Sequence, residues 1–227
     1  MNSPLATKTT GLKEAPESRL KRLLAFDDTL AQDLGLPVPL VGCDEVGRGS
    51  LIGSVVACAV LWKKTPQNVE GLWGLNDSKK LSPLQRQRLL PFIYEYCQVG
   101  LGEASPQDIA DYNIIGASLL AMKRAIDALD VQAPIHLLLD GRDALPDFPI
   151  HQQTCVIQGD AQSALIAMAS IVAKEHRDAW VQSVAIAYPE YGWGKNMGYA
   201  TKEHREAIKA WGLTPHHRPS FSIGSLA

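Results

Sequence analysis

The stretch Leu40–Trp62, LVGCDEVGRGSLIGSVVACAVLW, determines how the rest of the chain is interpreted. Leu40–Val46 is a short run of β-forming residues, and Ile52–Trp62 is a second run rich in valine. Such runs, bounded by turn residues, are typical of buried strands. Gly47–Gly49 separates them, because closely spaced glycines interrupt a strand. We therefore predict two neighbouring strands, with two acids close to the end of the first.

The remainder of the chain alternates between helix and strand signals. Ser82, followed by Pro83 and Gln85, is typical of a capping box, and Ser105 with Asp108 repeats this start signal. Further strands are expected at Tyr96–Leu101, Ile135–Leu139 and Thr154–Ile157, and further helices at Ile115–Leu129, Ala161–Ala187 and Lys202–Trp211. The pattern predicts a mixed α/β protein whose first strands are antiparallel and whose later strands are parallel.

The composition fits one compact domain with short appendages. Of the 227 residues, 46% are hydrophobic, and the formal net charge of −2 lacks the basic excess of many nucleic-acid-binding proteins. From Gly192 to the end, however, five Lys or Arg stand against two acids, so the C-terminal part is locally positive. The remaining negative charge is then available for a group of metal-binding carboxylates.

The cysteines and apolar runs predict a cytoplasmic protein with no membrane partner. The four cysteines have no C-x-x-C spacing, which favours free thiols in a reducing compartment. The longest apolar run, Val55–Trp62, is far too short to span a bilayer. The first residues have no apolar core of the kind found in signal peptides.

Residues 1–37 are expected to form an N-terminal extension, and residues 38–227 the main domain. Met1–Glu17 is polar and aperiodic, which predicts a disordered start. Leucines at helical spacing predict a helix over Ser18–Leu34, with Gly35 at its end. The main domain is expected to finish with a helical segment from about residue 190.

Four acids lie at predicted strand ends or helix starts, namely Asp44, Glu45, Asp140 and Asp160. Simple structural explanations exist for each: Asp160 could cap a helix, Asp140 could belong to a turn, and the first two could be solvated charges. Sites in open α/β sheets nevertheless form at the carboxyl ends of strands. Because Asp44 and Asp140 each end an apolar strand, the four acids together are a candidate site.

Neighbouring carboxylates repel one another and raise one another's pKa. Two divalent cations remove this repulsion, and ligation by oxygen alone favours hard ions such as Mg²⁺ or Mn²⁺. Two such ions about 3.5–4 Å apart can hold the attacking and leaving oxygens of a phosphoryl transfer. Adjacent strand residues point to opposite faces, so Asp44 and Glu45 share a site only if the strand breaks there; otherwise Glu45 acts from the edge.

Six motifs follow one another between Pro39 and Phe221. They are Asp44–Gly49 (DEVGRG), Leu75–Ser82 (LNDSKKLS), Leu139–Gly141 (LDG), Gly159–Asp160 with Ala169–Lys174 (ASIVAK) and Arg177–Asp178, Gly198–Thr201 (GYAT) with His204, and His216–Phe221 (HHRPSF). In this order they closely resemble the motifs of bacterial ribonuclease HII, the type 2 ribonucleases H. Departures from the family pattern are Glu175-His176, Ala200 and the long N-terminal extension.

The resemblance implies a ribonuclease H-like fold, with a five-stranded mixed sheet flanked by helices and a small helical C-terminal part. It implies that the four acids hold two Mg²⁺ or Mn²⁺ ions. It also implies an endonuclease that cuts the RNA strand of RNA/DNA hybrids and ribonucleotides embedded in duplex DNA. Cleavage would fall on the 5′ side of the ribonucleotide and leave 3′-hydroxyl and 5′-phosphate ends. The resemblance thus implies a role in ribonucleotide excision during DNA replication and repair.

The same resemblance implies substrate contacts outside the acids. The backbone of Gly47, Arg48 and Gly49 would approach the ribose 2′-OH, which separates RNA from DNA, and Tyr199 would stack on the next sugar. Asn76, Ser78 and Lys79 belong to the second motif, beside the helix start at Ser82, where N–H groups and ammonium charges form a candidate phosphate site. Lys174 would steady the scissile phosphate, or would simply pair with Asp178 one turn on.

Three alternatives stay open from the sequence. Ribonuclease HIII shares the fold and chemistry but would carry a larger N-terminal domain and lack Gly-Arg-Gly. A non-catalytic nucleic-acid-binding module of the same fold would use the acids only structurally. A zinc site could be built from His204, His216 and His217, although no cysteine ligand lies close in sequence. Under the leading interpretation the protein is a monomeric enzyme.

Overall fold

The computed structural model describes residues 14–35, 38–63, 69–219 and 221. The strands are β1 (Leu40–Val46), β2 (Val55–Trp62), β3 (Cys97–Ala104), β4 (His136–Asp140) and β5 (Gln153–Val156). The helices are α1 (Pro16–Asp33), α2 (Pro83–Tyr96), α3 (Pro106–Asp127), α4 (Ala164–Ala185), α5 (Trp193–Asn196) and α6 (Lys202–Trp211). None of the helices in these ranges is long and apolar enough to cross a membrane.

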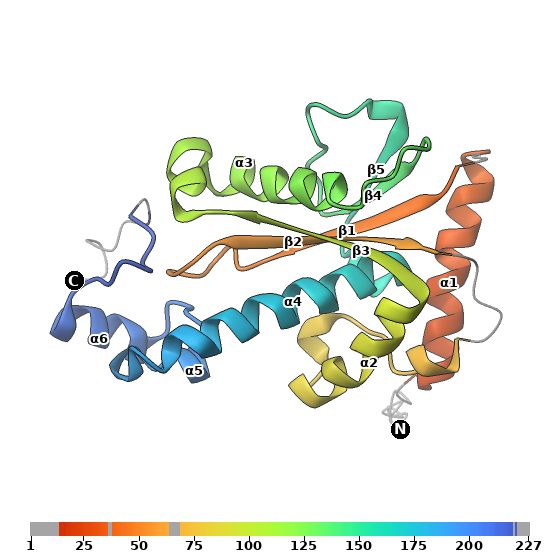
Figure 1. The fold of residues 1–227 in the computed structure, drawn as a ribbon. Coiled ribbons are helices and arrows are strands. Elements are labelled where there is room, and N and C mark those ends of the chain that lie inside the picture. The colour runs from red at the N-terminus through yellow and green to blue at the C-terminus, as the bar shows by residue number, and fades with distance from the viewer. Residues whose placement is uncertain (1–13, 36–37, 64–68, 220, 222–227) are drawn as a thin grey trace, which may run out of the picture.

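The strands form one five-stranded sheet in the order β3-β2-β1-β4-β5. β2 pairs antiparallel with both β1 and β3, whereas β4 pairs parallel with both β1 and β5. Helix α3 covers one face, and α4 and α2 cover the other, with α1 at one end of the sheet and α5 and α6 at the opposite end (Figure 1). The predicted mixed sheet, flanked by helices and followed by a helical C-terminal part, is therefore confirmed.

Helix α4 lies against β1 at a distance that only glycine allows. A methyl group at Gly42 would lie 2.4 Å from the carbonyl carbon of Leu165 and 2.6 Å from the amide nitrogen of Ile166. Three of the first seven residues of α4 are alanine, and all seven are buried. Small residues on both elements thus bring the helix backbone close to the strand that carries Asp44.

Two elements, α4 and β2, begin three residues later than expected. α4 starts at Ala164 rather than Ala161, because a 3₁₀ turn, Gly159–Ala161, comes first and Ser163 caps the helix with its side chain. β2 starts at Val55 rather than Ile52, because the residues before it bridge to the C-terminal part: Ser50 pairs with Tyr199 and Ile52 with His217. Residues 50–52 therefore connect the sheet to the C-terminal part of the chain instead of extending β2.

The two helical segments expected on either side of Asn113 form one element, α3, with a break inside it. Asn113 has φ 58° and ψ 178°, which is not helical, and its side-chain oxygen accepts from the amides of Ile115 and Gly116. The asparagine thus caps the second segment. Both predicted capping boxes, at Ser82 and at Ser105, are also present.

Helix α1 is part of the folded core. It begins at Pro16, so Pro16 and Glu17 are helical rather than part of a disordered start; proline fits here because the first helical position needs no N–H donor. Leu20 and Leu23 are each only 1% exposed and pack with residues of α4. The earlier part of the expected disordered start, residues 1–13, lies outside the described residues.

The C-terminal part is organised around a buried pair of histidines. His204 Nδ1 lies 3.0 Å from the carbonyl oxygen of Tyr199, and its Nε2 accepts from the indole N–H of Trp193. His217 Nε2 lies 3.2 Å from His204 Nε2, and its Nδ1 accepts from the amide of Thr214. All four ring nitrogens are therefore engaged within the protein. The zinc alternative is wrong for this structure, because His204 and His217 have no nitrogen free for a metal.

Substitution of Gly42 by Ala is expected to destabilise the protein by at least about 3 kcal/mol, because the new methyl group meets backbone atoms that cannot move aside. Chemical unfolding measures the difference. Gly194→Ala is the control, since its methyl group would meet only Gln182 Oε1 at 3.4 Å. Equal stability of the two variants would contradict the close packing of α4 on β1.

Acid is expected to weaken the C-terminal part. Burial, followed by the nearby His204, lowers the pKa of His217 to about 4, so this ring stays neutral in the folded protein. A base with a lowered folded pKa contributes stability above its ordinary pKa of about 6.5 and loses it as the pH falls towards 4. The unfolding free energy of the wild type, relative to His217→Gln, should fall by about 1–3 kcal/mol between pH 7 and pH 4.5. A difference independent of pH would refute this.

Candidate active site

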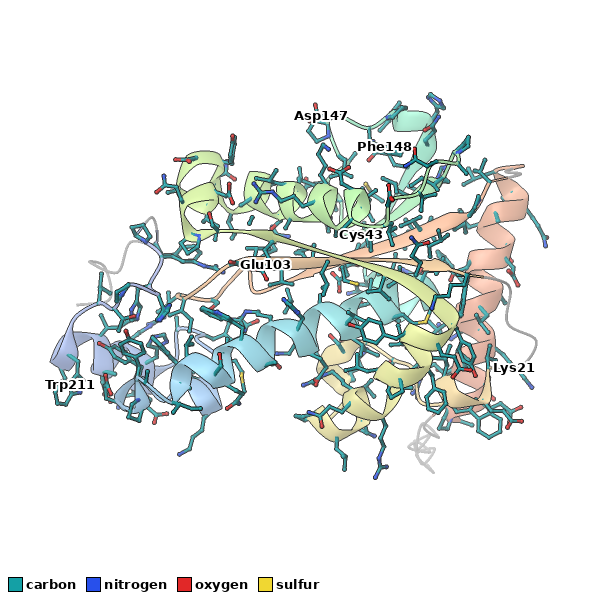
Figure 2. The ribbon with its side chains drawn as sticks, in the orientation of Figure 1. Lys21, Cys43, Glu103, Asp147, Phe148 and Trp211 are labelled. Carbon is teal, nitrogen blue, oxygen red and sulfur yellow. The ribbon has the colours of Figure 1, made fainter. Side chains whose placement is uncertain are left out.

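Strands β1 and β4 bring two of the predicted acids side by side. Their parallel register pairs Cys43 with Leu139, so Asp44 and Asp140 follow at the same level on neighbouring strands. Residues at one level of adjacent strands point to the same face. Cys43, labelled in Figure 2, lies in the middle of the sheet and directly precedes Asp44. The pair therefore stands at the carboxyl ends of two central strands, as the sequence predicts.

Asp44 is buried on the face that α4 covers. It is 4% exposed, and the hydroxyl of Ser170 on α4 lies near its carboxylate and favours the charged form. Burial raises the pKa of Asp44 well above its ordinary value, and the charges of Glu45 and Asp140 raise it further. Ser170 and the ammonium group of Lys79 oppose the rise without cancelling it. A positive charge placed beside Asp44 therefore stabilises its ionised form.

The turn between β5 and α4 carries the third acid to the same place. The amide of Gly159 donates to Asp140 Oδ1 at 2.6 Å, which ties this turn to the end of β4. Asp160, the next residue, is 6% exposed. Burial, then the charges of Asp77 and Asp140, raises the pKa of Asp160 to about 6. Lys79 Nζ lies 3.8 Å from Asp160 Oδ2 and lowers that pKa in part.

Glu45 approaches from the other side of β1. The strand is regular here, since Asp44 pairs with Cys58 and Glu45 with Ala57 in one unbroken ladder, so the two side chains point to opposite faces. The break that would let both enter one site is absent. Glu45 instead receives a hydrogen bond from Arg48 at 3.1 Å and lines a small cavity together with Asp140. It therefore reaches the site from the edge.

The donor set of these four residues fits hard divalent cations. It consists of carboxylate oxygens alone, and burial first and neighbouring acids second raise the pKa of the deeply buried Asp44 and Asp160. As the side chains stand, however, no group of three or more His, Cys, Asp or Glu within the described ranges surrounds a single point closely enough to hold an ion. One oxygen of Asp140 accepts from Gly159, and Asp160 pairs with Lys79. Ligation of an ion would therefore require these side chains to rotate.

The glycine-rich loop after β1 has a conformation that needs glycine. Gly47 has φ +92°, and a methyl group on it would lie 2.7 Å from Arg177 Nε and 3.3 Å from the Ser54 carbonyl oxygen. Arg218, which is completely buried, fixes the loop from behind. Its guanidinium donates to the carbonyl oxygens of Gly53, Arg48 and Ser54. The loop backbone is therefore held rigidly by side chains from distant parts of the chain.

Tyr199 lies beside this loop. The bridge between Ser50 and Tyr199 joins the two segments, and a methyl group on Gly49 would be 3.9 Å from the tyrosine ring. The guanidinium of Arg177 lies 5.3 Å from the centre of that ring. Arg177 also donates to Ser50 Oγ and to the Met197 carbonyl oxygen. One arginine thus orients both the loop and the aromatic ring.

The segment before α2 meets the acids through Lys79 but not through every predicted residue. Ser78 is 2% exposed, and its hydroxyl lies 2.8 Å from that of Ser170, so it supports the helix that faces Asp44. Asn76 accepts from the neighbouring amide of Asp77 and stays partly exposed. Lys79, whose side chain is 74% exposed, is the member of this group best placed to reach a bound phosphate.

Lys174 is engaged elsewhere. Its Nζ donates to Asp178 Oδ1 at 2.7 Å. Arg86 of α2 bonds to the same aspartate at 3.5 Å and to Glu175 at 2.5 Å. The lysine thus belongs to an ionic network that joins α2 to α4, which is the simpler of its two predicted explanations. A catalytic role for Lys174 stays a prediction without a supporting contact.

Several residues of this site were missed from the sequence as functional residues. They are Asp77, Ser170, Arg177, Arg218 and Arg142, the last of which lines the cavity beside Glu45 and Asp140. All but Arg142 lie inside the six motifs, so position within a motif was the available signal. What the motifs do not reveal is which side chain faces the acids and which supports the loop.

Known proteins match most of this chain. The family model described as ribonuclease HII matches residues 41–223. Ribonuclease HII of Parabacteroides distasonis is 46% identical over 183 residues, which is 80% of this chain and 89% of that protein. Ribonuclease HII of Thermotoga maritima is 43% identical over 198 residues, which is 87% of this chain and 78% of that protein.

Solved structures match in fold. The ribonuclease HII in a complex with PCNA from Archaeoglobus fulgidus superimposes with a TM-score of 0.64 at 22% identity, over 81% of this chain and 95% of that chain. Bst-RNase HIII in complex with Mn²⁺ also gives a TM-score of 0.64, at 19% identity, over 83% of this chain and 68% of that chain. With the fold, the acids and the sequence relatives in agreement, the chain belongs to the ribonuclease HII family and is a ribonuclease H, a hydrolase.

Proposed function

We propose that this enzyme is an endonuclease that cuts on the 5′ side of a ribonucleotide by two-metal-ion hydrolysis and leaves 3′-hydroxyl and 5′-phosphate ends. Its substrates would be RNA/DNA hybrids and duplex DNA with embedded ribonucleotides. The observation that carries the proposal is the gathering of Asp44, Asp140 and Asp160 at one end of the sheet, where burial and mutual repulsion raise the pKa of Asp44 and Asp160.

The four acids, Asp44, Glu45, Asp140 and Asp160, would hold the ions. Asp44 and Asp140 would do so from neighbouring strand ends, Asp160 from the following turn and Glu45 from the edge. When bound, two Mg²⁺ or Mn²⁺ ions would supply the Lewis-acid chemistry of phosphodiester hydrolysis. Bst-RNase HIII, which has the same fold, forms a complex with Mn²⁺, and this supports a divalent cation here.

Recognition of the ribonucleotide would fall to Gly47–Gly49 and Tyr199. The absence of side chains on the glycines lets backbone groups approach a 2′-hydroxyl, and the ring of Tyr199 lies beside them for stacking on a sugar. Arg177 and Arg218 would keep both in place. A rigid arrangement of this kind can discriminate a hydroxyl from a hydrogen, because the loop does not move to compensate for a missing or misplaced hydrogen-bonding group.

Phosphates of the substrate would be met by positive groups around the acids. Lys79 projects from the 3₁₀ turn Ser78–Lys80, just before α2, beside Asp160, and its side chain is mostly exposed. The C-terminal part adds the positive excess seen in the sequence. Such groups attract the nucleic-acid backbone without reading its sequence.

We further propose that the enzyme acts as a monomer in the cytoplasm. The four cysteines are all free, and three of them are buried, which suits a reducing compartment. The division into an extension of residues 1–37 and a catalytic domain of residues 38–227 remains part of this proposal.

Substitution of Asp44 by Asn should abolish cleavage of a duplex DNA that contains one ribonucleotide. The amide cannot neutralise the ions, and loss of several kcal/mol of transition-state stabilisation corresponds to at least about a 1000-fold fall in rate. Binding of the same duplex, measured by fluorescence anisotropy, should stay within about threefold of the wild type.

The control for this experiment is Asp147→Asn, which removes the same charge from an exposed position in the loop between β4 and β5 (Figure 2). It should cleave like the wild type. If the wild type itself cut no ribonucleotide in the presence of Mg²⁺ or Mn²⁺, the alternative of a binding module would be correct. Cleavage that persisted in a chelator would exclude the metal mechanism.

Substitution of Gly47 by Ala should lower kcat/KM on this duplex at least about tenfold, because the methyl group collides with Arg177 and displaces the loop. Gly212→Ala is the matched control. Gly212 has φ +78° but no atom within 4 Å of the added methyl group, so it carries the backbone strain without the collision. Equal activity of the two variants would contradict a role of the loop in ribonucleotide recognition.

A further inference from the structure

Helix α1 lies outside the part of the chain that matches the ribonuclease HII family model, which begins at residue 41. It nevertheless packs beneath the candidate site. Phe26 and Leu30 contact a small buried cluster formed by Leu138, Val156 and Ile166. Leu138 lies two residues before Asp140, and Val156 ends the strand that precedes Asp160. The helix thus supports the strand that carries Asp140 and the strand that precedes the turn of Asp160.

Asp27 of α1 reaches the beginning of α4. It is only 5% exposed, and its Oδ2 accepts from the amide of Leu165 at 3.1 Å, across 138 positions of sequence. The carboxylate stands at a helix N-terminus, where free N–H groups and the helix dipole favour a negative charge. Ser163, the cap of α4, is completely buried beside it and helps to lower the pKa of Asp27.

Burial of the Asp27 carboxylate against α4 costs folding free energy, which argues against a purely stabilising role for this residue. Burial raises the pKa of Asp27 to about 7, even though Ser163 and the amides of Leu165 and Ala164 oppose the rise. Its second oxygen, Oδ1, is buried with no hydrogen-bond partner among the described residues. A buried acid that is only partly satisfied is more readily explained by the position it enforces than by the stability it adds.

Arg22, five residues before Asp27 on α1, contacts the 3₁₀ turn Gly159–Ala161 that precedes α4. Its Nη1 donates to the carbonyl oxygen of Ala161 at 3.1 Å, and Ala161 is the residue directly after Asp160. The same guanidinium pairs with Glu14 at 3.0 Å, so it is held in a fixed direction. Arg22 therefore contacts the chain immediately after Asp160, and Asp27 contacts the first turn of α4.

We propose that α1 is a clamp that positions Asp160, with Arg22 and Asp27 as its two positioning residues. The proposal rests on the proposed function, because it assumes that Asp160 is a metal ligand. Asp160 sits in a short 3₁₀ turn, Gly159–Ala161, which lacks the rigidity of a long helix. Residues that orient a ligand from behind affect metal affinity although they do not touch the ion.

The test compares Asp27→Ala and Arg22→Gln with two matched controls on the same helix. Asp28→Asn removes a neighbouring exposed acid, and Lys21→Gln removes an exposed cation whose side chain is 73% exposed (Figure 2). Hydrogen exchange of the amides from Gly159 to Ile166 is measured on the metal-free protein. Mn²⁺ affinity is then measured by calorimetry, and kcat and KM are measured at several Mn²⁺ concentrations.

In Asp27→Ala the exchange of these amides should become about tenfold faster, and Mn²⁺ should bind about tenfold more weakly. Arg22→Gln should change both quantities in the same direction but less. Cleavage should recover at high Mn²⁺ with KM for the duplex unchanged, which a general loss of folding would not produce. If Asp27→Ala does not fold, Arg22→Gln decides, since its side chain is half exposed and outside the core.

If Asp27→Ala and Arg22→Gln both show the same amide exchange and the same Mn²⁺ affinity as the controls, the proposal that α1 positions Asp160 is wrong. The proposed function would remain intact. Faster exchange with unchanged Mn²⁺ affinity would also overturn the proposal for α1, because the turn would then be loosened without effect on the ligand. Wild-type protein that binds no Mn²⁺ would instead remove the proposed function, and the clamp with it.

Discussion

Mutual repulsion among buried carboxylates is the constraint on which the rest of this structure depends. Asp44 is placed by the register of β1 beside Asp140, on a face sealed by α4, and cannot turn to solvent. Its raised pKa reflects burial first and neighbouring acids second. Such a group destabilises the fold when ionised, so the surrounding chain must hold it in place until a cation or a proton compensates the charge. Ser170 and the close packing at Gly42 serve that purpose.

The glycine-rich loop requires a second set of buried charges, of opposite sign. It presents backbone rather than side chains, so its shape must be imposed from behind. Arg218 does this through three carbonyl oxygens, and burial, followed by the nearby Arg177, lowers the pKa of its guanidinium to about 9. Arg218 and Arg177 together therefore fix the shape of the loop. Both arginines come from segments far away in sequence, so the loop is correctly shaped only when the C-terminal part is folded.

Much of the fold followed from local signals, whereas the supporting contacts did not. Apolar runs gave β1 with its observed bounds, and capping residues located the starts of α2 and α3. The strand periodicity also indicated that Asp44 and Glu45 point to opposite faces, which the unbroken ladder bears out. The pairing of Lys174 with Asp178 instead of a site carboxylate, and the reach of Asp27 to α4, depend on how whole helices pack. A partner 138 positions away leaves no pattern in a local window of sequence.

The same carboxylates explain how an acidic chain can act on a polyanion. Its formal net charge of −2 should disfavour nucleic acid, yet two divalent cations at the site would reverse the sign of that charge. The added positive charge would lie beside Lys79, where the phosphate backbone must approach. Cation binding and substrate binding would then be linked, each strengthening the other by the same factor. The loaded site would therefore attract the scissile phosphate, while contacts with the rest of the duplex would hold the substrate whether or not the ions are bound.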